Sequence, residues 1–168
     1  RRYNIGYPQG LGDLAHYLCS TISNEYSVHS LTKISGCKSD KTVKKYLDYL
    51  EQTFLFFSVP RFSFKFKEQV SSHKKIYCID NGFITAKGFS SSRNSGRLLE
   101  NIVAVSLKKD ELSGLINFYY WKNAQQEEID FVIRVYHKII ALVQVCTKMD
   151  DSNTKEREIR ALLKGAHD

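Results

Sequence analysis

The stretch SDKTVKKYLDYLEQ (residues 39–52) decides how the N-terminal part of this chain folds. Its apolar residues recur at i, i+3, i+4 and i+7, the spacing of one helix face: Val43, Tyr46, Leu47 and Leu50. We therefore predict a helix over residues 40–52, capped by Ser39 or Asp40, with this face packed inward. The polar residues on the opposite face are Lys41, Lys44, Lys45 and Asp48.

The residues before this helix predict two shorter ones. Apolar residues at helical spacing indicate a first helix over residues 11–22. Ser27 is placed to cap a second helix over residues 28–34, and the turn GCKS (residues 36–39) follows it. A short helix, a turn containing glycine and a longer helix form the pattern of a helix-turn-helix, with the third helix as the reading helix.

The residues after it predict a wing. Residues 54–60 are rich in Phe and Val, and residues 61–67 alternate strictly between apolar and polar side chains, as a half-buried strand does. A polar loop over 69–74 and a strand over 75–79 follow. Strands that close against a three-helix unit predict a winged helix-turn-helix near residues 11–80.

Positive charge is concentrated in this module. Residues 33–75 hold ten basic and four acidic side chains, a net charge of +6, whereas residues 81–168 carry only +2. Such a local excess suits a polyanion such as DNA. The predicted DNA contacts from the third helix are Lys38, Lys41, Thr42, Lys44 and Lys45, and those from the wing are Lys65, Lys67, Lys74 and Lys75. A winged helix can also serve as a protein-docking module, so this alternative stays open.

The C-terminal half predicts an α/β module. Residues 82–96 are rich in Gly, Ser and Asn and predict a loop. Residues 97–109 form an apolar helix that we expect to be largely buried. Three strands follow, over residues 116–121, 128–135 and 138–146, and a helix over 153–164. The last strand is almost continuously apolar, as in a central strand covered on both faces.

Several short motifs, in this order, resemble one family. They are TVKKYLDYLE (residues 42–51), YCIDNG (77–82), GRLLEN (96–101), EIDFV (128–132) and VQVC (143–146). Together they resemble the C-terminal region of archaeal and bacterial AAA-type ATPases. The resemblance implies a winged helix over residues 1–82 and a truncated PD-(D/E)XK nuclease-like domain over 83–168, an α+β module followed by a restriction-endonuclease-like α/β module.

The resemblance also implies an ATPase domain upstream of Arg1, through which the parent protein could form oligomers. The phosphate-binding motif G-x-x-x-x-G-K-(S/T) does not occur in these 168 residues. We therefore expect no nucleotide cofactor in this chain itself.

Mapped onto this sequence, the nuclease motif is incomplete. The chemistry needs carboxylates that hold Mg²⁺ and a cation beside them. The resemblance places Glu100 and Asp130 at two acid positions, but Gln144 replaces the third acid and Cys146 replaces the lysine. Lys148, or Glu156 and Glu158 on the last helix, could compensate. We expect the site to be inactive or repurposed, with at most weak metal binding at Glu100 and Asp130.

The composition of the chain limits the class of protein and the cellular compartment that the sequence predicts. The chain is 42% hydrophobic and 26% charged, with no apolar run near the length of a membrane span. The four cysteines show no Cys-x-x-Cys spacing, which favours reduced thiols in a cytoplasmic protein without a metal site of that kind.

Three functions remain open. The first is a DNA-binding region of an ATPase without chemistry of its own. The second is a metal-dependent DNA endonuclease with an altered site. The third is a protein-interaction or oligomerisation module. The basic stretch favours the first two, and Gln144 and Cys146 favour the first over the second.

Overall fold

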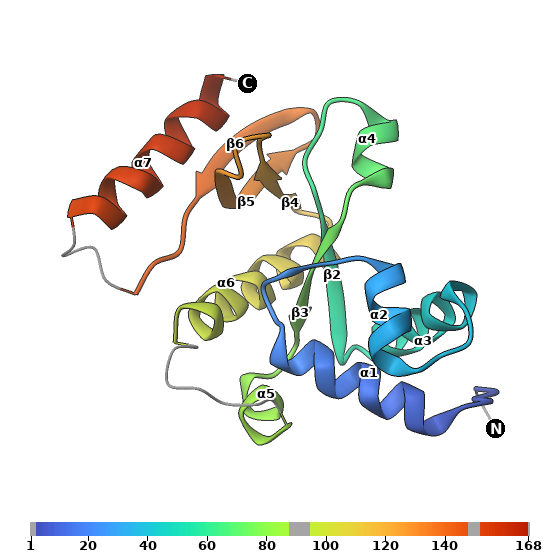
Figure 1. Cartoon of the computed structure of the whole chain (residues 1–168). Coiled ribbons are helices and arrows are strands. Elements are labelled where there is room, and N and C mark those ends of the chain that lie inside the picture. The colour runs from blue at the N-terminus through green and yellow to red at the C-terminus, as the bar shows by residue number, and fades with distance from the viewer. Residues whose placement is uncertain (1–2, 88–94, 148–151, 168) are drawn as a thin grey trace. The chain divides into compact units, whose positions relative to one another are not determined.

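A computed structural model describes residues 3–87, 95–147 and 152–167 (Figure 1). The chain forms two compact units, and neither is a continuous stretch. The first consists of residues 1–58 and 73–92, and the second of residues 59–72 and 93–168. Residues 59–72, which the sequence analysis assigns to the wing, therefore belong to the same unit as the C-terminal half.

The first unit combines helices with a small sheet. Its elements are α1 (Pro8–Ser20), β1 (Glu25–Tyr26), α2 (Val28–Ser35), α3 (Asp40–Gln52), β2 (Phe56–Pro60), β3 (Lys74–Cys78) and α5 (Asn81–Lys87). The strands are ordered β1-β3-β2, and β1 pairs antiparallel with β3. β2 begins in this unit, and its last two residues belong to the second.

The predicted starts of α2 and α3 and their serine caps are confirmed. Ser27 Oγ accepts a hydrogen bond from the Ser30 backbone N–H (3.1 Å), and Ser39 Oγ accepts one from the Thr42 N–H (3.3 Å). Each serine thereby satisfies a donor that the first helical turn leaves free. Gly36 ends α2 with a φ of +63°, a left-handed conformation that favours glycine.

The inward face of α3 is also confirmed. Val43, Tyr46, Leu47 and Leu50 are all buried. They belong to the core of the unit together with buried residues of the other elements, including Leu14, Leu18, Leu31, Ile76 and Tyr77. Burial of one helix face leaves the polar face outside, so the amphipathic pattern fixes which side of α3 can meet a partner.

The predicted strand over residues 61–67 is wrong. The chain leaves the sheet after Pro60 and forms a short helix, α4 (Phe66–Ser71). Ser63 Oγ accepts a hydrogen bond from the Lys65 N–H (3.1 Å) and donates one to Glu68 Oε2 (3.0 Å). Such local side-chain hydrogen bonds compete with strand pairing, which the alternation of apolar residues does not reveal.

The predicted loop over residues 82–96 is also wrong in part. Residues 81–87 form α5, because Asp80 Oδ1 accepts a hydrogen bond from the Gly82 N–H (2.7 Å) at the start of the helix. Residues 95–96 already belong to the next helix, α6. Residues 88–94 lie outside the described residues.

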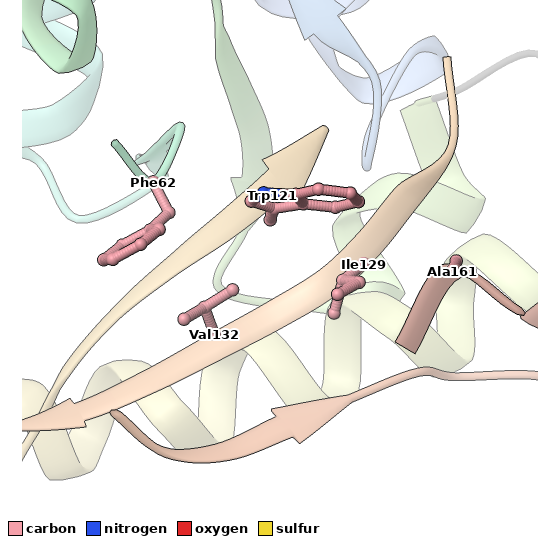
Figure 2. Close-up of a cluster of buried hydrophobic side chains, with 5 residues drawn as sticks. All are labelled: Phe62, Trp121, Ile129, Val132 and Ala161. Atoms are coloured by element: carbon pink, nitrogen blue, oxygen red, sulfur yellow. The ribbon is translucent and has the colours of Figure 1, made fainter. Parts of the chain in front are cut away.

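The second unit contains the predicted helix, three strands and helix. They are α6 (Ser95–Leu112), β4 (Asn117–Lys122), β5 (Glu128–Val135), β6 (Lys138–Val143) and α7 (Ser152–His167), with an antiparallel sheet in the order β4-β5-β6. α6 contacts β4, and α7 packs against β5 and β6. A buried cluster joins the sheet to α7 and to the segment before α4: Phe62, Trp121, Ile129, Val132 and Ala161 (Figure 2).

An irregularity in the pairing of β5 with β4 lies at Asp130, one of the predicted nuclease residues. Tyr119 is opposite Val132 and Trp121 is opposite Ile129, so β5 has one residue more than β4 between these pairs. This is a β-bulge, and Asp130 lies in it. The bulge lets Ile129 and Val132 join the same cluster, which simple alternation along β5 would not allow.

Two predictions about burial are wrong. β6 is the edge strand of its sheet rather than a central strand, and Ile140 is 58% exposed. α6 is not largely buried, since Leu99 and Ile102 are exposed. An apolar stretch of sequence indicates that a face can be buried, but it does not identify the element that packs against that face. None of the helices within the described ranges combines the length and apolar character needed to cross a membrane.

Candidate nucleic-acid interface and nuclease-like site

The start of α3 presents the predicted basic surface. The side chains of Lys38, Lys41, Lys44 and Lys45 are exposed, and Thr42 is half-buried. The Thr42 hydroxyl lies 3.1 Å from Ser39 Oγ, so it is already engaged in the helix cap. The lysines are therefore the groups of this surface best placed to meet phosphates.

Residues 3–7 lie along α3, a contact that the sequence analysis did not predict. The Tyr7 backbone N–H donates to the Tyr46 hydroxyl (2.8 Å), and that hydroxyl donates to the Tyr7 carbonyl (3.1 Å). The Tyr3 ring lies 4.4 Å from the Tyr49 ring, centroid to centroid. The tyrosines at 46 and 49 are three residues apart and are therefore neighbours on the helix. This pair of aromatic side chains is the feature of the sequence that could have indicated a contact with another segment.

Lys45 is held partly by this segment. Its Nζ donates to the Asn4 carbonyl (3.4 Å) and lies 5.6 Å from the centroid of the Tyr49 ring. Lys38, Thr42 and Lys45 line one cavity of about 570 Å³ with residues of the N-terminal segment and the Gly36 turn. The predicted residues are thus brought together, but Lys41 and Lys44 are not part of that cavity lining.

The predicted wing lysines differ in their exposure and in the unit to which they belong. Lys74 is exposed on β3, whereas Lys75 is 1% exposed, so the expectation that Lys75 lies along a DNA backbone is wrong. Lys75 is buried because β3 is the central strand of its sheet, and every residue of β3 after Lys74 is buried. Lys65 and Lys67 are exposed, but they belong to the second unit, at the start of α4.

Two of the predicted nuclease positions, Asp130 and Gln144, are joined by a hydrogen bond, and Asp130 accepts a second one from Val145. The Asp130 backbone N–H donates to Gln144 Oε1 (3.2 Å), and the Val145 N–H donates to Asp130 Oδ2 (2.8 Å). Asp130 is only 6% exposed. One carboxylate oxygen of Asp130 and the amide oxygen of Gln144 therefore tie the bulge of β5 to the residues that follow β6.

The remaining predicted nuclease residues are less closely gathered. Glu100 lies half-buried on α6, beside the buried Asn101. Lys148 lies outside the described residues. Of the two acids on α7, Glu156 is exposed, whereas Glu158 and Gln144 line the same cavity of about 460 Å³. Within the described ranges, no three His, Cys, Asp or Glu side chains are grouped closely enough to hold a metal ion.

A charged cluster that no local sequence pattern predicts lies beside that cavity, and two of its members, Glu127 and Arg160, line it. Glu127 accepts hydrogen bonds from Lys164 Nζ (2.7 Å) and Asn123 Nδ2 (2.7 Å), and Arg160 Nε lies 3.0 Å from its other oxygen. The hydrogen bond from Lys164 is the main reason that the pKa of Glu127 lies below its ordinary value. The partners are up to 37 residues apart, so only the fold brings them together.

Comparison with known proteins divides the chain into two domains. Residues 3–93 match a domain of unknown function, DUF8612, and residues 95–167 match a second one, DUF4143. An uncharacterised protein of Methanocaldococcus jannaschii is 32% identical over 99% of this chain and 37% of its own length. An uncharacterised protein of Haemophilus influenzae is 30% identical over 83% of the chain and 32% of its own length.

The chain therefore spans about a third of the length of these relatives. No solved structure matches it significantly. The match to the first domain covers more than half of the residues, from the segment that lies on α3 to the end of the first unit. On this basis the chain belongs to the DUF8612 family, with a DUF4143 domain following in the same chain.

Proposed function

We propose that this chain is a DNA-binding region of a larger ATPase and that it has no chemistry of its own. The observation that carries the proposal is the arrangement of α3. One face of this helix is buried in the core, and Lys41, Lys44 and Lys45 are exposed on the helix. Lysines on one side of an anchored helix can contact several phosphates at once.

The topology of the first unit supports a winged helix. Three helices, α1 to α3, accompany three short strands in the order β1-β3-β2. In this arrangement the segment between β2 and β3 would be the wing, and it contains α4 instead of a simple loop. Lys74, at the start of β3, is the wing lysine that remains available within the first unit.

The comparisons support the link to an ATPase. DUF4143 domains are typically found in AAA-ATPase-associated regions. The chain covers only about a third of its relatives, so the full-length proteins have room for an ATPase domain. This chain holds no phosphate-binding motif of the P-loop kind, so nucleotide binding would fall to that other domain.

The second unit would be a nuclease-like domain that no longer cleaves. The order α6-β4-β5-β6-α7 agrees with the order that the sequence pattern predicts. Asp130 Oδ2 accepts the Val145 N–H, and Gln144 offers a neutral oxygen where the motif has a carboxylate. A hard dication prefers carboxylates, so this pair is a weak ligand set for Mg²⁺.

One observation favours the alternative of an altered endonuclease. Glu158 lines the same cavity as Gln144, so a carboxylate from α7 could replace the missing acid. Lys164 and Arg160, which contact Glu127 in the same region, are cations of the kind that could stabilise a phosphate. A plasmid cleavage assay with Mg²⁺ or Mn²⁺ separates this alternative from the main proposal.

The experiment for the main proposal is a binding titration with fluorescently labelled duplex DNA at low salt. We expect weak binding with little sequence preference, and a loss of affinity when Lys41, Lys44 and Lys45 are all replaced by Ala. The matched control replaces Lys109, Lys138 and Lys155, three exposed lysines of the second unit, and removes the same charge. Equal losses in both triple variants, or no binding by the wild type, would refute the proposal.

A further inference from the structure

A third cavity also lies entirely within the second unit and is not used by the proposed duplex-binding surface. Its volume is about 530 Å³, within the range typical of small-ligand sites. It lies between the segment that leads into α4, the strands β4 to β6 and the end of α7. The lining residues that matter here are Arg61, Phe62, Phe64, Lys65, Trp121 and Lys122.

The cavity offers an exposed aromatic ring that packs against a buried one. The Phe64 side chain is 76% exposed, although its ring packs edge-to-face against Phe62 at 4.9 Å between centroids. Phe62 is itself buried and packs edge-to-face against Tyr119 at 5.7 Å. Phe64 is therefore supported from behind while its surface remains open to solvent. A ring of this kind can stack with a flat ligand without first losing much side-chain freedom.

Positive charge surrounds this ring. Arg61, Lys65 and Lys122 line the cavity, against one acid, Glu68. Lys65 pairs with Glu68 at 3.0 Å, but both side chains are more than half exposed, and such surface pairs are weak and exchangeable. The Arg61 guanidinium donates to the Lys122 carbonyl, which fixes its position at the edge of β4. Lys122 Nζ lies 3.8 Å from Glu128 Oε2, an acid outside the lining. With that acid included, three cations face two carboxylates, so the region keeps a net positive charge beside an aromatic platform.

We infer that this cavity binds an unpaired nucleotide of single-stranded DNA, with the base stacked on Phe64 and the neighbouring phosphate contacting Lys65 and Lys122. The inference rests on the proposed function and adds a single-strand site to it. Every base has a flat face, so stacking beside cations gives sequence-tolerant affinity for single strands. A base inside a duplex is stacked on its neighbours and cannot enter, which separates this site from the α3 surface.

The chain provides its own probe for the test. Trp121 is its single tryptophan and lines the cavity, so its fluorescence should change when the cavity is filled. The titration uses an oligothymidylate of about twelve nucleotides, within the span of known single-strand sites. We expect saturable quenching, weakened at least about fivefold by Phe64→Ala, the loss expected when one stacked base is released. Phe64→Tyr should retain binding.

The controls separate this inference from the duplex proposal. Phe54→Ala removes a phenylalanine of similar exposure, 67%, from the first unit and should leave the quenching unchanged. The triple variant of Lys41, Lys44 and Lys45 should lose duplex affinity and keep the Trp121 response, whereas Phe64→Ala should do the reverse. Circular dichroism checks that each variant is folded. Unchanged oligothymidylate affinity in folded Phe64→Ala, or quenching by an acidic peptide but not by oligothymidylate, would overturn the inference.

Discussion

The polar residues of α3, predicted from their helical spacing, and Asp130, a nuclease position implied by the family resemblance, are in opposite physical situations. On α3, Lys41 and Lys44 are exposed, because the apolar side of the helix alone supplies its packing. Asp130 is buried in a β-bulge and one of its oxygens accepts the Val145 N–H. The first group is available to a partner, whereas the second already stabilises its own unit.

This difference shows how a pattern of polar residues should be interpreted. An exposed charge adds little to stability, so the exposed lysines of α3 can contact a partner without any cost to the packing of the unit. A buried carboxylate needs hydrogen bonds wherever it occurs, and those bonds alone can account for it. Asp130 therefore does not by itself indicate metal chemistry, and the lysines of α3 are the stronger indication of function.

The largest expected effect separates the two faces of α3. Leu47→Ala should lower the free energy of unfolding by about 2–5 kcal/mol, because Leu47 is only 7% exposed and its loss leaves a cavity in the core. Lys44→Ala, on the exposed surface of the same helix, should change it by less than about 0.5 kcal/mol. Urea unfolding of both variants measures the contrast. Similar costs for the two would mean that Lys44 has a structural role.

A smaller effect tests whether Asp130 is structural. Asp130→Ala leaves the Val145 N–H without its acceptor and should cost about 1–3 kcal/mol of stability. Asp130→Asn keeps an acceptor oxygen and should cost less. The stability of both variants can be measured by urea unfolding.

The same variants test for cleavage. We expect no plasmid nicking by the wild type with Mg²⁺ or Mn²⁺, since the pair Asp130 and Gln144 lacks the second carboxylate that would hold the metal. Metal-dependent nicking by the wild type that disappears in Asp130→Asn would show that Asp130 has a catalytic role and not only a structural one. It would support an altered endonuclease.

The smallest effect concerns the pH dependence of the second unit. The pKa of Glu127 is lowered from 4.5, first by the hydrogen bond from Lys164 and then by that from Asn123. The folded state then holds this proton less tightly than the unfolded state does. Its stabilising contribution is therefore complete above pH 4.5 and disappears as the pH falls through the lowered pKa.

Glu127→Gln should accordingly make stability fall less steeply as the solution is acidified below pH 4.5. Urea unfolding across the acid range gives the slope. Glu156→Gln, which changes an exposed glutamate on α7, is the matched control and should keep the wild-type slope. Identical slopes for wild type and Glu127→Gln would show that the ion pairs of Glu127 do not stabilise the fold.

The helices with clear amphipathic patterns and serine caps were predictable from the sequence. α3 has the bounds that its pattern predicts, and Ser27 and Ser39 cap as expected. β5 also has its predicted bounds. In these elements the local preference and the tertiary packing agree, so the sequence pattern alone is sufficient.

The predictions failed where local hydrogen bonds or distant partners decide the structure. Alternating phenylalanines after Pro60 suggested a strand, but Ser63 and Glu68 bond locally and a helix forms. The basic pattern predicts an exposed Lys75, but its place on the central strand β3 buries it. The cluster around Glu127 and the contact of Tyr7 with Tyr46 join residues far apart in sequence, which no local pattern can reveal.

The salt dependence of duplex DNA affinity tests the central claim most directly, because each lysine–phosphate contact releases counterions. The logarithm of the binding constant should fall linearly with the logarithm of salt concentration, with a slope of about −0.9 per contact. If α3 supplies the contacts, replacing Lys41, Lys44 and Lys45 by Ala should reduce the magnitude of that slope by about two to three. The control variant of Lys109, Lys138 and Lys155 should keep the wild-type slope. Equal slopes in wild type and in the α3 variant would contradict the account.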